Sequence, residues 1–81
     1  MERDFETVCE QIIKAAPEIL AYKLERDFGF WAPEIRWLRL SNYVNDYVIP
    51  SSKDPRSIKV YAILCDCSEE KMKETFERDG I

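Results

Sequence analysis

The best strand candidate in the chain is the stretch Ser57-Ile58-Lys59-Val60-Tyr61-Ala62-Ile63-Leu64-Cys65. Its residues alternate between two faces, which is the period-two pattern of a β-strand. One face would carry Ile58, Val60, Ala62 and Leu64. The other face turns apolar at Ile63, so we expect the later half of the strand to be covered on both sides. The predicted fold class depends on this strand.

The segment before that strand is ambiguous. Residues 34–40 and 43–49 are rich in aromatic and branched side chains, and Ser41-Asn42 suits a tight turn, so we expect two further strands. The alternative is a helix over residues 33–48, which would gather on one arc Trp37, Leu40, Tyr43, Val44, Tyr47 and Val48. Ile35 and Leu38 would lie off that arc. Residues 50–57 contain two prolines, three serines and an Asp, which predicts an exposed loop.

Both ends of the chain are predicted to be helical. Apolar residues recur at three- and four-residue spacing from Phe5 to Leu24, which favours helices near 3–15 and 17–28, kinked or split at Pro17. At the other end, Ser68 suits an N-cap of an acidic helix that Gly80 would end. We therefore expect one α+β domain over 1–81, with an N-terminal helix, a small antiparallel sheet of two to three strands and a C-terminal acidic helix.

Several chemical groups that enzymes use are missing from the composition. The chain has no histidine, which removes the commonest general base and the partner in Ser-His and Cys-His pairs. It has two glycines, too few for a glycine-rich phosphate loop. We therefore expect no catalysis and no cofactor.

Charge is distributed unevenly along the chain. The formal net charge is -4, with -3 in residues 1–10, +2 in 34–64 and -3 in 66–81. An acidic chain is not attracted to nucleic acid or to an anionic membrane, so we expect a basic protein partner. No apolar run reaches the ~18 residues of a membrane span, and the N-terminus lacks a signal peptide.

The three cysteines are predicted to be reduced. Cys65 and Cys67 are two residues apart, which rarely allows a disulfide, and Cys9 leaves the count odd. A zinc site needs about four ligands, and three thiols without an imidazole do not supply them. These features indicate a cytoplasmic protein with no metal site.

Two groups of residues are candidates for partner binding. The C-terminal helix would present Glu69, Glu70, Glu74 and Glu77, and the aromatic turn before Pro33 would present Trp31. Trp and Arg are frequent binding hot spots, which makes Arg36, Trp37 and Arg39 secondary candidates.

The function predicted from these features is stoichiometric contact with a basic, possibly nucleic-acid-handling protein. Small size, acidity and lack of catalytic groups are typical of inhibitors such as phage-encoded anti-defence proteins, immunity proteins and antitoxins. One alternative is an RNA-binding module with a basic-aromatic sheet face. That face would combine Arg36, Arg39 and Lys59 with Tyr43, Tyr47 and Tyr61. Another alternative is a structural subunit of a larger complex.

Overall fold

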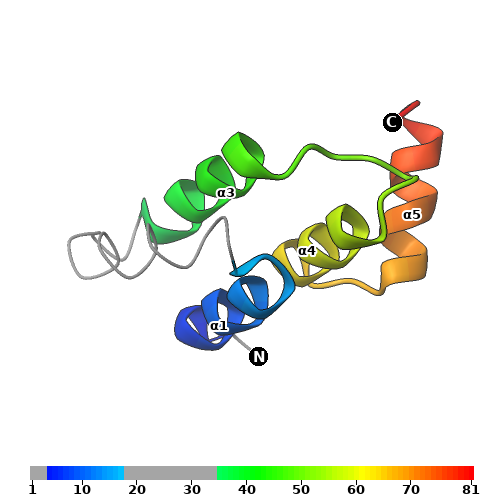
Figure 1. Ribbon diagram of the computed structural model, residues 1–81. Helices are drawn as coiled ribbons and strands as arrows, with labels where there is room; N and C mark the ends of the chain where they lie inside the picture. The colour runs from blue at the N-terminus through cyan, green and yellow to red at the C-terminus, as the bar shows by residue number, and fades with distance from the viewer. Residues whose placement is uncertain (1–3, 18–34) are drawn as a thin grey trace.

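The described part of the chain is built from α-helices (Figure 1). The computed structural model describes residues 4–17 and 35–81. These ranges contain α1 (Phe5–Ala15), α3 (Arg36–Tyr47), α4 (Pro55–Cys65) and α5 (Glu69–Arg78). None of the residues in these two ranges belongs to a strand. The predicted α+β fold and its antiparallel sheet are therefore wrong.

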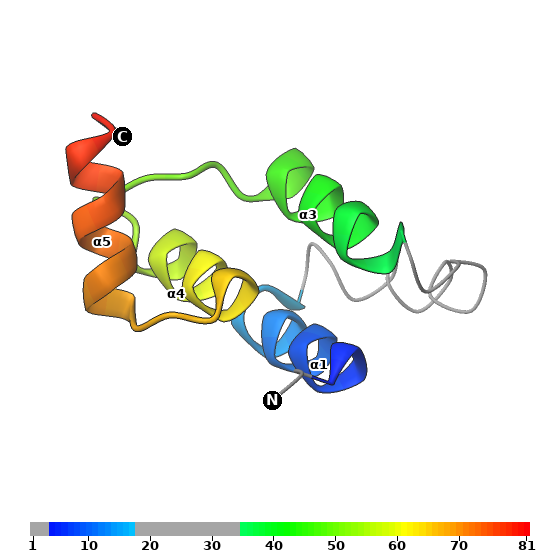
Figure 2. The ribbon, with the colours of Figure 1, turned by 180° about the vertical axis from the view of Figure 1, so that it is seen from behind.

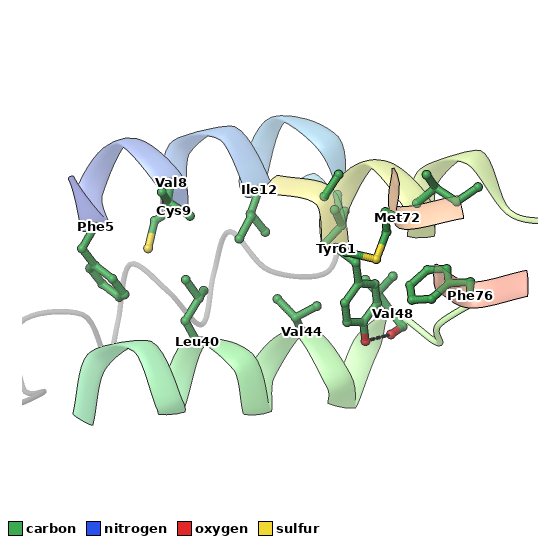
Figure 3. Close-up of a cluster of buried hydrophobic side chains, with 14 residues drawn as sticks. Phe5, Val8, Cys9, Ile12, Leu40, Val44, Val48, Tyr61, Met72 and Phe76 are labelled. Carbon is green, nitrogen blue, oxygen red and sulfur yellow. Dashed lines mark hydrogen bonds between the residues drawn. The ribbon is translucent and has the colours of Figure 1, made fainter. Parts of the chain in front are cut away.

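Helix α4 is the centre of the arrangement. Helices α1 and α5 both pack against it, and Figure 2 shows α1 and α5 beside different parts of α4. Helix α3 faces α1 and α4 with its apolar side chains, including Leu40 and Val44 (Figure 3). All four helices contribute to one core, which contains Phe5, Val8, Cys9, Ile12, Ala16, Leu40, Val44, Val48, Ile58, Val60, Tyr61, Ala62, Met72 and Phe76.

The position of α4 explains why its sequence looks like a strand. Val60, Tyr61 and Ala62 follow one another in the chain, and all three are buried. A helix that is covered on most sides has no polar stripe, so its sequence becomes a continuous apolar run that period analysis cannot distinguish from a buried strand. The strand predicted over 57–65 is therefore a helix.

The start of α4 lies inside the predicted loop 50–57. The side chain of Asp54 accepts a hydrogen bond from the backbone N–H of Arg56 at 3.0 Å, and Pro55 occupies the first helical turn. This combination is a favourable helix start. The Asp54 oxygen pairs with a backbone N–H that has no partner within the helix, and Pro55 has no backbone N–H that would need one. The loop prediction is correct only for the residues before Pro55.

Helix α3 replaces the two strands predicted over 34–40 and 43–49. Leu40 and Val44, one helical turn apart, are completely buried. Ile35 and Leu38, which do not fit a helical stripe, remain 37% and 62% exposed. The alternative of a helix over 33–48 agrees with α3, because the structure leaves these two misfitting side chains in solvent.

The two terminal helices with clear caps were predicted correctly. In α1 the Asp4 side chain accepts a hydrogen bond from the backbone N–H of Glu6. The helix ends before Ala16, which has a non-helical backbone because Pro17 follows it. In α5 the Ser68 side chain accepts from the N–H of Lys71. The helix predicted over 17–28 extends outside the described residues.

A buried tyrosine joins three helices. The Tyr61 hydroxyl of α4 lies 2.7 Å from the carbonyl oxygen of Val48, the residue that caps α3 (Figure 3). It also lies 2.8 Å from Asn45 Oδ1. Its ring meets the ring of Phe76 of α5 edge to face, with 5.6 Å between centroids. Tyr61 therefore fixes the ends of α3 and α5 relative to α4.

Tyr61→Phe should lower the free energy of unfolding by about 1–2 kcal/mol, because the Val48 carbonyl loses a buried donor. Asn45→Ala is the matched control and should cost less, since Asn45 is exposed and water replaces the lost contact. Urea unfolding followed by circular dichroism measures both changes. Equal losses in the two variants would show that the Val48 contact does not hold α3 in place.

Candidate functional site

Helix α5 carries the four glutamates predicted as partner contacts. Glu69, Glu70, Glu74 and Glu77 are all exposed, whereas Met72 and Phe76 of the same helix are buried. None of the four carboxylates forms an ion pair or hydrogen bond with another residue of the described ranges. We call these four residues the acidic face of α5. All four are therefore accessible to a partner.

An open depression lies between this helix and the start of α4. Its volume is about 670 Å³, and its lining consists of Ser52, Lys53, Pro55, Ile58, Glu69, Glu70, Lys73 and Glu77. Ile58 is 8% exposed and therefore lies at the bottom, while the exposed charged side chains form the rim. We call this hollow the α5 depression. It brings together three of the four predicted glutamates and leaves Glu74 outside.

Hydrogen bonds hold the loop that forms one wall of the α5 depression. The backbone N–H and the hydroxyl of Ser52 both donate to the carbonyl oxygen of Ile81, each at 2.9 Å. Behind the loop, the fully buried Ser57 hydroxyl donates to the carbonyl of Ile49 and accepts from the N–H of Ser51. The wall is therefore tied both to the end of α5 and to α4.

The end of α5 is shaped by Gly80. This glycine has φ +80°, the N–H of Ile81 donates to the carbonyl of Phe76, and the N–H of Gly80 donates to the carbonyl of Glu77. The two bonds make the Schellman motif, in which a left-handed residue ends the helix. They place the Ile81 carbonyl where Ser52 binds it.

Arg36, Trp37 and Arg39 do not line the α5 depression. Trp31 is outside the described residues. Trp37 is half-buried and packs edge to face on the Phe5 ring, 5.0 Å between centroids, and the Arg36 guanidinium lies 5.9 Å from the same ring. These two side chains therefore pack α3 against α1. Arg39 is exposed on α3.

The basic-aromatic sheet face of the RNA-binding alternative is not formed. Residues 35–81 contain no strand to present it, and Tyr61 is buried with its hydroxyl directed at Val48. Lys59 is exposed on α4, while Tyr43 and Tyr47 are half-buried on α3. The stacking surface on which that alternative depends is therefore absent from the described part of the chain.

The cysteines occupy three different environments. Cys9 is buried in the core, Cys67 is half-buried and Cys65 is exposed, with the left-handed residue Asp66 between the last two. Among the described residues there is no cluster of three or more side chains suited to holding a metal ion. In the same ranges no helix is long and apolar enough to span a membrane.

The residues that sequence reasoning missed are those that complete the depression with the glutamates. Ser52, Pro55 and Ile58 are far from α5 in sequence, and nothing in their local pattern points to a shared site. The Asp54-Pro55 helix start was the available signal, because it would have placed Ile58 on a helix.

The thiol of Cys9 should make stability depend on alkaline pH. Burial, with a smaller contribution from the Glu6 carboxylate, raises the pKa of Cys9 from 9.0 to about 12. As pH rises, the thiol therefore loses its proton in the unfolded chain before it does so in the folded protein. The contribution of the buried neutral thiol to the free energy of unfolding is complete below about pH 9 and is lost between about pH 9 and 12. The loss is at most ~1.4 kcal/mol per pH unit.

Urea unfolding of the protein and of Cys9→Ala between pH 7 and about 11.5 tests this dependence. The stability difference between the two proteins should shrink as pH rises. Burial also raises the pKa of Tyr61, with a further contribution from Cys65, but that effect is common to both proteins and cancels. Parallel stability curves would contradict the assignment to Cys9.

Gly80→Ala should lower the free energy of unfolding by about 1 kcal/mol, since a side chain opposes the left-handed backbone. Steric contact contributes nothing, because no atom lies within 4 Å of an added Cβ. Gly80→Asn should cost less, because asparagine tolerates this conformation. Thermal unfolding measures both variants, and an unchanged midpoint in Gly80→Ala would rule out the motif as the stop of α5.

Comparison with known proteins provides no relative from which a role for these residues could be inferred. No protein-family model, no curated protein and no solved structure matches the chain. The acidic face of α5 and the α5 depression are therefore the basis on which we infer a function.

Proposed function

We propose that the protein acts by stoichiometric contact with a basic partner protein, as an inhibitor that binds through the acidic face of α5. The observation that carries this proposal is the set of four exposed carboxylates with no ion pair among the described residues. Helix α5 is anchored through Met72 and Phe76, so its remaining surface is free to meet a partner.

Electrostatics favours a partner of opposite charge. Complementary charge accelerates encounter and penalises wrong partners, and carboxylates that are not already paired lose no internal contact on binding. Along the helix axis Glu70 and Glu77 are about 10 Å apart, given a rise of ~1.5 Å per residue. Such a row of negative charge can occupy a basic groove that otherwise holds nucleic acid, which is how anti-defence, immunity and antitoxin-like proteins could act.

Charge reversal at Glu70→Lys/Glu74→Lys should abolish capture of the partner while circular dichroism stays unchanged. Both side chains are exposed, so the fold does not depend on them. The matched control is Glu10→Lys/Asp46→Lys, which makes the same change in net charge on α1 and α3, at two other exposed carboxylates.

The measurement is quantitative affinity capture from the native host with the three proteins side by side. A basic protein held by the parent and the control, and lost by the α5 variant, supports the proposal. Capture that survives reversal on α5 would overturn it. Loss in both variants would point to bulk charge, and not to this face.

A further inference from the structure

We propose that the α5 depression receives a short arginine-bearing segment of the partner, with the aliphatic part of one arginine over Ile58 and its guanidinium among the rim carboxylates. This inference rests on the proposed function, and it specifies which part of a basic partner the protein recognises. The binding segment would combine cationic and apolar side chains.

The form of the α5 depression suits a peptide. Its volume of about 670 Å³ falls within the usual range for ligand sites, roughly 300–1,000 Å³, and exceeds what one side chain fills. Ile58 at the bottom and Pro55 beside it offer an apolar surface to the stem of a long side chain. Arginine and lysine bury such stems while their charged ends remain at a polar rim.

The charges on the rim select a cation. Glu69, Glu70 and Glu77 outnumber the two ammonium groups, those of Lys53 and Lys73. An acidic segment would be repelled, and a purely apolar one would take water from carboxylates without replacing its hydrogen bonds. Arginine suits the rim better than lysine, because its planar guanidinium can donate two parallel hydrogen bonds to one carboxylate.

The wall opposite α5 is held in place before binding. Ser52 donates twice to the Ile81 carbonyl, and Ser57 fixes Ile49 and Ser51 behind it. A wall that is already ordered costs less conformational entropy when a segment binds. The depression is therefore formed in the free protein, and we expect the loop to move little on binding.

The test uses a short fluorescein-labelled peptide of arginine and leucine, titrated with the full chain at low salt. Glu77→Gln, on the rim, should weaken binding about three- to tenfold. Glu74→Gln is the matched control on the same helix. Glu74 belongs to the acidic face that we propose meets the whole partner, but it does not line the depression, so its loss should weaken binding of this short peptide less than about twofold. A peptide with glutamate in place of each arginine should not bind.

Isotope-labelled isoleucine methyl groups report directly on the depression. The methyl resonance of Ile58 should shift saturably with the peptide, while that of Ile35, the N-cap residue of α3, should not. Equal weakening by the two glutamine variants with an unmoved Ile58 methyl would overturn the depression and leave the acidic face as the contact. Failure of the peptide to bind would also overturn the proposal that the α5 depression binds an arginine-bearing segment. The proposed function would then be tested by partner capture alone.

Discussion

The structure depends on the burial of α4, a helix that is covered by the other described helices on most of its sides. Burial of Tyr61 carries an energetic cost, because a phenol hydroxyl removed from water must keep a hydrogen-bond partner. The Val48 carbonyl provides that partner, and the Phe76 ring covers the aromatic edge. One side chain of α4 thereby determines where α3 ends and where α5 packs.

The candidate site follows from this arrangement. Helix α5 packs on α4 through Met72 and Phe76, which leaves its acidic face in solvent. The start of α4 lies beside α5, so Ile58 and Pro55 share one depression with Glu69, Glu70 and Glu77. The bonds from Ser52 to Ile81 then close the far wall. The acidity of the surface is a property of α5 alone, but the depression exists only because α4 is a helix.

Local signals in the sequence predicted the parts of the fold that carry their own caps and a single apolar stripe. Ser68, Gly80 and the Met72–Phe76 spacing were sufficient for α5, and Pro17 marked the end of α1. They could not identify α4, because burial on several sides removes the polar stripe that distinguishes a helix from a strand. A helix over residues 33–48 was only the alternative to two strands, because Ile35 and Leu38 would lie off its apolar arc, and the structure leaves both side chains exposed.

The same limit applies to the site. The four glutamates of the acidic face could be selected from the sequence, since charge on a capped amphipathic helix with two anchors must face water. Ser52 and Ile58 could not be joined to them, because that contact is made across the fold. Arg36 and Trp37 were selected by residue type, and the structure shows them packing α3 on α1 through Phe5.

The helical state of residues 57–65 is the claim on which both the core and the α5 depression depend. Backbone ¹³Cα chemical shifts of the isotope-labelled protein test it directly, because helices and strands displace these shifts in opposite directions from their unfolded values. The structure predicts downfield displacement through every residue from Ser57 to Leu64. Upfield displacement over the same residues would mean a strand, and would contradict the fold.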